Sequence, residues 1–192
     1  MHALRGLQAG ISWAAVALAG LLFATAPAAA AERFEIRNAF AEPVNGVWNL
    51  NAIIDLGLTD AAREALDEGI SLTLVLDVEI TVERRFLPDA SIAELAQRWE
   101  LAYDALSQRY VVTNLNSRAR SAHATLEESL DELSHVRALP LVDAALLREG
   151  KRHEISVRAE LEIGGVPDAI KVLIFWRDWT LTTDWYTWSV RP

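Results

Sequence analysis

Aromatic side chains gather near the end of the chain, in the stretch DWTLTTDWYTW, which spans residues 178–188 and holds three of the seven tryptophans. Tyrosine and tryptophan combine a large apolar ring with a polar tip, so an exposed group of them can hold a sugar ring or a peptide. The carboxylate of Asp184 would add a polar contact. The candidate ligand-binding residues are Trp185, Tyr186, Trp188 and Asp184.

The threonine content and the alternation of this stretch predict a final strand. On such a strand one face carries Trp179, Leu181, Thr183 and Trp185, and the other carries Asp178, Asp184, Tyr186 and Trp188. The favoured interpretation is that the first face is core and that the second covers the edge of a sheet, with its polar tips in water. An exposed aromatic patch of that size is unusual unless it is used.

Histidine and nucleophile chemistry find little support. Metal or base chemistry would require His123, His135 and His153 to converge, and no pair among them has the spacing of a known ligand motif, so solvent-exposed histidines are predicted. There is no cysteine, no G-x-S-x-G elbow and no S-x-x-K motif. We therefore expect no catalytic residue, no metal site and no cofactor. A hydrolase that uses carboxylates or a histidine stays as a second alternative to the non-catalytic functions given below.

The first 31 residues have the pattern of a secretory signal peptide. A short basic start is followed by an apolar middle, and Ala29 and Ala31 supply the small residues of a cleavage site before Glu32. The alternative is an uncleaved anchor in the inner membrane, because 17–25 apolar residues can span a bilayer. We expect cleavage after Ala31, export to the periplasm of a Gram-negative cell and a single β-rich domain over residues 32–192.

The charge balance excludes some partners. The chain has 18 basic and 27 acidic residues, which give a net charge of −9. Removal of the N-terminal segment would also remove Arg5 and would make the charge more negative by one. An acidic surface repels phosphate groups, so neither nucleic-acid binding nor direct binding to anionic lipid is expected. Without cysteine there are no disulfides, and stability must come from packing. The oligomeric state stays open.

Strand patterns dominate the rest of the chain. Residues 71–83 and 154–163 alternate apolar and polar side chains, as half-buried antiparallel strands do. Residues 48–56 show the same pattern, and the sequence PVNG links them through a turn to a short strand that contains Phe34 and Ile36.

Other segments are helical or ambiguous. Residues 58–69 and 125–136 predict two short helices, the second with a capping box between Thr125 and Glu128. Residues 92–106 fit either a helix or a strand, and we favour a strand from about Gln97 that pairs with residues 110–115. Residues 169–176 predict a buried strand or a short helix. The predicted fold class is mainly β, an antiparallel β-sandwich-like domain with two short helices, preceded by a signal peptide.

The succession of these segments resembles an uncharacterised family of exported proteobacterial proteins. The resemblance covers residues 58–82, RWELAYDALSQRYVVTNLNS at 98–117, the helix from Thr125 with LPLVDAALL at 139–147, and DWxLxxDWYTW at the end. Trp185, Tyr186 and Trp188 match a near-terminal W-Y-x-W ending. The resemblance carries over no activity, cofactor or catalytic residue, but it implies a periplasmic partner role. Genes of the family often lie beside that of a membrane sensor kinase of the nitrogen-regulation type.

Three functions are compatible with these sequence features. The first is a non-catalytic protein-interaction module with an envelope or inner-membrane partner, favoured because sheet edges can add a partner strand. The alternative is a glycan- or peptidoglycan-binding module that uses the C-terminal aromatics. The hydrolase is the second alternative, because it needs a convergence of side chains that sequence spacing does not indicate.

Overall fold

The computed structural model describes residues 33–163 and 180–192. They belong to the second of the two units into which the chain divides, Glu32–Pro192. The strands in this part are β1 (Phe34–Val44), β2 (Val47–Leu56), β3 (Leu72–Val82), β4 (Ala90–Asp104), β5 (Arg109–Asn114), β6 (Arg120–His123), β7 (His135–Asp143), β8 (His153–Ile163), β9 (Leu181–Thr182) and β10 (Tyr186–Val190). The helices are α1 (Asp60–Asp67), α2 (Leu126–Ser134) and the short 3-10 helix η2 (Ala144–Leu146).

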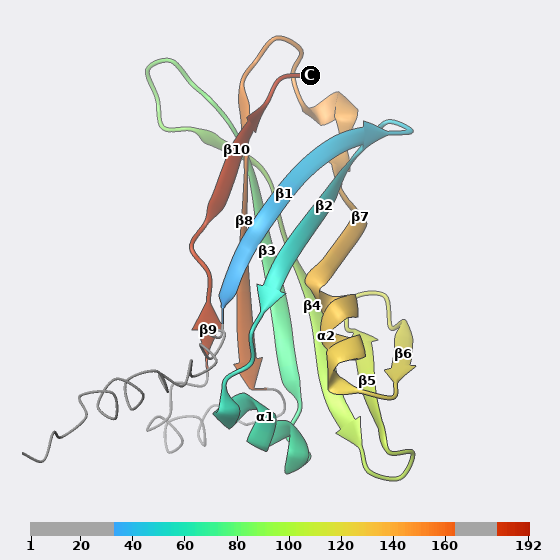
Figure 1. Cartoon of the computed structure of the whole chain (residues 1–192). Coiled ribbons are helices and arrows are strands. Elements are labelled where there is room, and N and C mark those ends of the chain that lie inside the picture. Colours follow the sequence, from blue (N-terminus) through green and yellow to red (C-terminus); the bar gives the residue numbers. More distant parts are fainter. Residues whose placement is uncertain (1–32, 164–179) are drawn as a thin grey trace, which may run out of the picture. The chain divides into compact units, whose positions relative to one another are not determined.

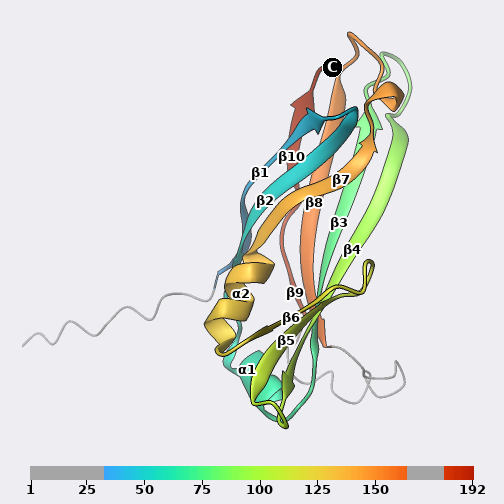
Figure 2. The same ribbon diagram turned by 90° about the vertical axis from the view of Figure 1, so that its right-hand side faces the viewer.

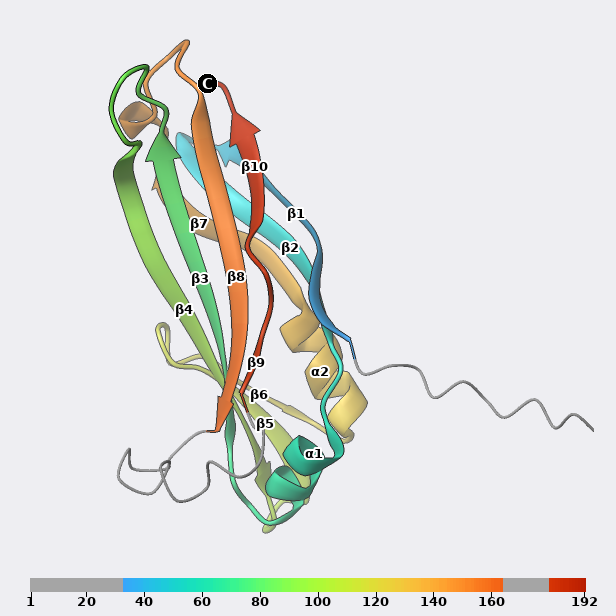
Figure 3. The ribbon, with the colours of Figure 1, turned by 90° about the vertical axis from the view of Figure 1, so that its left-hand side faces the viewer.

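Two antiparallel sheets form the domain. The smaller sheet has the order β1-β2-β7, and the larger has the order β10-β8-β3-β4-β5-β6, with β9 also paired to β8. Figures 2 and 3 show the smaller sheet lying over the face of the larger one, with α1 and α2 toward one end. The prediction of a mainly β, sandwich-like domain with two short helices is confirmed.

The core lies between the two sheets and follows directly from the two-residue alternation. On β3, the central strand, Leu72, Leu74, Leu76, Val78 and Ile80 are each at most 1% exposed. Inward-facing residues of β2 and β8 complete the same apolar cluster. Full burial of one such aliphatic side chain contributes about 1.5–3 kcal/mol, so this face fixes the register of the strands.

Local chemistry explains the predicted turn and helices. Asn45 and Gly46 both have positive φ, 52° and 82°, as a two-residue hairpin turn between β1 and β2 requires. Thr59 caps α1 by accepting a hydrogen bond from the backbone of Ala62 at 3.2 Å. Thr125 caps α2 in the same way through the backbone of Glu128, which confirms the predicted capping residue.

The ambiguous stretch is a strand. β4 runs from Ala90 to Asp104 and pairs with β3 along nearly the whole length of that strand, so the strand interpretation of residues 92–106 is confirmed. It begins earlier than the predicted Gln97 because its first half also finds partners on β3. The segment 169–176 lies outside the described residues, as do Trp176, Asp178 and Trp179.

Sequence analysis missed β6 and β7. β6 has only four residues. β7 lacks a clean alternation because it contains Pro140 and because Ala138 has a positive φ of 48°. Both features suit the edge of a sheet, where proline and local irregularity are tolerated.

Candidate functional site

The C-terminal aromatic stretch is interrupted by one extra residue. Leu181 pairs with Leu161, and Tyr186 pairs with Val157, so five steps along the last segment oppose four steps along β8. The interruption is held at Thr183, whose backbone N–H and side-chain Oγ1 bond to the carbonyl and amide of Ala159. An odd insertion of this kind reverses which face the following side chains occupy.

The reversal changes the faces predicted for the aromatic residues. Leu181, Tyr186 and Trp188 all pack against the core, whereas Trp185 is 40% exposed. The prediction that Trp185 shares a core face with Leu181 is therefore wrong, because the alternation does not continue through Thr183. Asp184 is exposed beside it. The structure thus places the candidate residues on different faces of the sheet, although Asp184, Trp185 and Tyr186 still line one hollow of about 370 Å³ beside Phe34, and Trp188 does not.

Trp185 lies on the outer face of the larger sheet. The guanidinium of Arg158 stacks on its ring, 4.7 Å from the centroid, and also bonds Asp77 at 3.0 Å. One face of the exposed ring is therefore covered by a cation. Tyr186 and Trp188 pack against each other on the opposite side of the sheet, with ring centroids 6.0 Å apart.

The three histidines have separate partners. His123 Nε2 bonds the carboxylate of Glu132, and His135 Nδ1 lies 2.8 Å from Ser134 Oγ. His153 is completely buried at the start of β8, and its Nε2 accepts a 3.2 Å hydrogen bond from the backbone of Arg148. The prediction of exposed histidines is wrong for His153, because a strand residue in phase with Ile155 faces the core.

The histidine beside α2 does not form a nucleophile relay. Ser121 Oγ donates to both carboxylate oxygens of Glu132, at 2.9 and 2.7 Å, and His123 contacts the same carboxylate. A relay needs the histidine between the hydroxyl and the carboxylate. Across residues 33–163 and 180–192, no group of three or more histidine and acidic side chains is placed to hold a metal ion.

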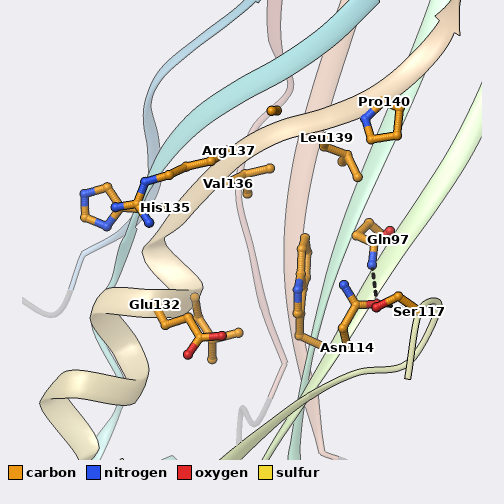
Figure 4. A pocket seen from close by; sticks show the side chains of 12 residues that line it. Gln97, Asn114, Ser117, Glu132, His135, Val136, Arg137, Leu139 and Pro140 are labelled. Carbon is orange, nitrogen blue, oxygen red and sulfur yellow. Dashed lines mark hydrogen bonds between the residues drawn. The ribbon is translucent and has the colours of Figure 1, made fainter. Parts of the chain in front are cut away.

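A cleft of about 450 Å³ opens between the two sheets beside β7. Its walls come from β4, β5, the β5–β6 turn, the end of α2 and β7 (Figure 4). The lining residues are Gln97, Trp99, Asn114, Ser117, Glu132, Leu133, His135, Val136, Arg137, Ala138, Leu139 and Pro140. Apolar walls with a few placed polar groups are the composition of ligand sites.

An amide network forms one wall of this cleft. Gln97 is only 7% exposed, and its Nε2 donates to Asn114 Oδ1 at 2.9 Å (Figure 4). The same oxygen accepts from the backbones of Asn116 and Ser117, at 3.0 and 2.9 Å. Asn114 therefore fixes both the turn and the orientation of the Gln97 amide, which is how a polar group becomes preorganised.

The opposite wall is an edge strand. Among the described residues β7 pairs only with β2, so its other edge carries no neighbouring strand. Arg137 and Ala138 are exposed there, and Leu139 is half-buried at the mouth of the cleft. The His135 ring points away from Gln97, to the other side of β7 (Figure 4). The cleft thus joins an open backbone edge to a partly apolar hollow.

Residues 31–189 match the family described as a domain of unknown function, DUF4390. The chain belongs to this family. No curated protein and no solved structure matches the chain. None of the helices that the structure describes has the length and apolar composition needed to cross a bilayer.

Sequence analysis of this DUF4390 chain missed the cleft residues, although Gln97 leaves a trace in the sequence. It stands in phase with Leu95, Trp99 and Leu101, at a position where the alternation of β4 predicts an apolar side chain. A polar residue at an inward position indicates a buried hydrogen bond or a site. Ser117 and Asn114 leave no comparable trace, because turn residues are polar for local reasons.

Proposed function

We propose that this DUF4390 protein is an exported, non-catalytic interaction module of the bacterial envelope, and that it holds an extended segment of a partner in the cleft beside β7. The observation that carries the proposal is the juxtaposition of an unpaired strand edge with the hollow lined by Gln97 and Trp99. An extended peptide can bond an open edge through its backbone while one of its side chains enters an adjoining pocket.

The edge itself limits what can bind. Pro140 lacks an amide hydrogen, and Ala138 has left-handed backbone torsions, so β7 cannot add a long regular strand. Specificity then depends on the side chain that enters the cleft. Apolar contact with Leu133 and Leu139, and a hydrogen bond near Gln97, suit a segment that carries an apolar or amide side chain.

The partner to test first is a membrane sensor kinase of the nitrogen-regulation type, as the family resemblance implies. Its extracytoplasmic part would supply the extended segment. This choice requires the chain to be exported, which the pattern of residues 1–31 supports.

The glycan alternative has weaker geometric support. A platform needs neighbouring rings with free faces, whereas Tyr186 and Trp188 pack against the core and Arg158 covers one face of Trp185. The hydrolase alternative has no relay in the described part either: His123 and Ser121 contact the same carboxylate of Glu132. His135 meets the Ser134 hydroxyl and the Asp131 carboxylate through one ring nitrogen, Nδ1, so the ring does not connect them.

Site-specific crosslinking in living cells tests the proposal. A photoreactive amino acid at Arg137, which is exposed on the lip of the cleft, should capture one membrane protein. The same amino acid at Phe40, which is 47% exposed on the far edge strand of the same sheet, should not. Identical products at both positions, or none at Arg137, would contradict the proposal.

A matched pair of variants then tests the cleft. Ser117→Trp places a bulky ring at the rim of the cleft and should abolish the Arg137 crosslink. Ser107→Trp makes the same change in the exposed β4–β5 turn, which does not line the cleft, and should leave the crosslink intact. If both variants keep the crosslink, the partner binds elsewhere.

A further inference from the structure

Exposed apolar side chains gather at one end of the domain. Phe86 and Leu87, in the connection between β3 and β4, are 88% and 62% exposed. Leu146 on η2 is 58% exposed, and Val44 at the end of β1 is 45% exposed. Figure 1 shows these three connections at the same end of the sheets. They contribute four of the eight large apolar side chains exposed in the described part, so the grouping is not an even scatter.

Backbone hydrogen bonds hold this loop end together. Glu83 N–H donates to Arg152 O at 3.0 Å, joining the β3–β4 connection to the start of β8. Ala144 N–H donates to Gly46 O at 2.8 Å, joining η2 to the β1–β2 turn. The apolar side chains are therefore presented by connected loops, which lowers the entropy lost when they bind together.

The charge of the loop end differs from that of the rest of the chain. Segments 83–89 and 143–154 contain equal numbers of basic and acidic residues, whereas the whole chain carries a net charge of −9. Arg84, Arg85, Arg148 and Lys151 are exposed, and none of them forms an ion pair with a carboxylate of the described residues. The Arg85 guanidinium lies 5.5 Å from the Phe86 ring centroid. Two exposed arginines thus precede Phe86, the most exposed apolar residue of this end, and one of them lies against its ring.

We propose that the loop end, defined by Val44, Phe86, Leu87 and Leu146 with Arg84 and Arg85, binds the surface of an anionic bilayer. Phe86 and Leu87 enter the boundary between headgroups and acyl chains, and the two arginines contact lipid phosphates. Apolar side chains beside basic ones are the composition of interfacial anchors. The expectation of no binding to anionic lipid used the net charge of the whole chain, and the loop end does not share that charge.

The geometry favours a bilayer over a protein pocket. The four apolar side chains rise from three separate connections. A deformable, nearly flat surface can meet all of them at once, whereas a preformed pocket admits one protruding loop. Each arginine near an anionic surface should raise the affinity about fivefold, so the electrostatic and apolar contributions can be measured separately.

The absence of cysteine from the chain allows a position-specific test with the full-length protein. Leu87→Cys is labelled with a fluorophore that shifts to the blue in an apolar medium. Leu106→Cys is the matched control, because Leu106 is 99% exposed in the β4–β5 turn, at the other end of β4 (Figure 1). Vesicles of phosphatidylglycerol and phosphatidylethanolamine should shift the label at position 87 and leave the label at position 106 unchanged.

Two further variants separate the contributions. Replacement of both Arg84 and Arg85 by glutamine should raise the vesicle concentration needed for half of the shift about 25-fold. Phe86→Ser should largely remove the shift. These residues are exposed, so circular dichroism and the unfolding midpoint should match those of the unchanged chain.

Three results would overturn the proposal. The chain could sediment with vesicles while the label at position 87 stays unshifted, which would assign binding to another segment, including the apolar N-terminal one. The labels at positions 87 and 106 could shift equally, which would indicate adsorption without orientation. The label at position 87 could shift with a soluble partner protein but not with vesicles, which would assign the loop end to protein recognition.

Discussion

The two open sides of the sandwich are built differently. On one side β1 lies beside β9 and β10, and the inward side chains Tyr186, Trp188 and Val190 pack against the core (Figure 3). On the other side β7 faces β4, and α2 lies toward one end of these strands (Figure 2). A cleft of about 450 Å³ remains there between the sheets. On the first side large apolar rings seal the core, although a hollow of about 370 Å³ lined by Phe34, Asp184 and Trp185 opens at its edge. The second side keeps Gln97 and Asn114 between the sheets.

The two sides separate the residues that stabilise the fold from those that indicate a site. In the described part of the aromatic stretch, Leu181, Tyr186 and Trp188 pack on the core, whereas Trp185 lies outside it. On the cleft side, Gln97 stands where the alternation of β4 predicts an apolar side chain, and β7 leaves one edge of its sheet unpaired. A departure from good packing that the fold nevertheless retains is the more informative sign of a site.

The largest effect is expected on the sealed side. Trp188→Ala removes a ring that packs on the core and on Tyr186, and it should lower the free energy of unfolding by about 3 kcal/mol. Urea denaturation followed by circular dichroism measures this loss. Trp185→Ala is the matched control, because it removes a tryptophan of the same strand region that lies outside the core, and it should lower the free energy by less than about 1 kcal/mol. Equal losses would show that the two rings are not divided between core and surface.

The next effect concerns the amide network on the cleft side. Asn114→Ala removes an oxygen that accepts from Gln97 Nε2 and from two backbone amides, and it should lower the free energy of unfolding by about 2 kcal/mol. Asn114→Asp keeps an acceptor at the same place, so its loss should be much smaller. The same denaturation experiment compares the two, and similar losses would mean that the hydrogen bonds contribute little.

Sequence analysis located most of the framework because the strands that form the core obey the alternation. β2, β3 and β8 follow it over ten or eleven residues, and both helices lie within the predicted segments 58–69 and 125–136. It failed where one residue breaks the rule. The extra residue near Thr183 reversed the C-terminal faces, and Pro140 with the left-handed Ala138 concealed β7. The cleft depends on β7, so it could not be predicted without that strand.

A third effect, on the pH dependence of stability, is expected from His153. This residue lies at the start of β8, where β8 pairs with β3 on one side and with β10 on the other. Burial lowers the pKa of this ring, because the charged form is disfavoured in the core; the backbone of Lys151 opposes part of this lowering, and the charge of Arg148 adds a smaller lowering effect. Protonation would also remove the acceptor for the Arg148 backbone amide. The unfolded chain therefore takes up the proton first, and stability should fall as the pH drops below the ordinary histidine pKa of about 6.5.

His153 should make the free energy of unfolding fall by at most about 1.4 kcal/mol for each unit that the pH drops below about 6.5. This fall ends when the pH reaches the lowered pKa of the folded state. His153→Gln keeps a hydrogen-bond acceptor but cannot titrate, so its unfolding free energy should depend less on pH below about 6.5. His135→Gln, at a partly exposed ring on β7, is the comparison variant, and an equal loss of pH dependence in both variants would show that the effect is not specific to the buried ring. A slope unaltered by His153→Gln would mean that carboxylates alone cause the acid sensitivity.

The smallest effect on stability and the sharpest test of the comparison come from Gln97→Leu. The leucine restores the apolar alternation of β4 and loses one hydrogen bond, while Asn114 Oδ1 keeps its two backbone donors. These changes oppose each other, so the free energy of unfolding should change by less than about 1 kcal/mol in either direction. The Arg137 crosslink, however, should be lost, because the polar group on the wall of the cleft is gone. A residue whose removal leaves the fold intact but ends binding belongs to a site. If Gln97→Leu instead destabilises the domain as much as Trp188→Ala does, both sides of the sandwich are structural, and the cleft is a packing defect without a ligand.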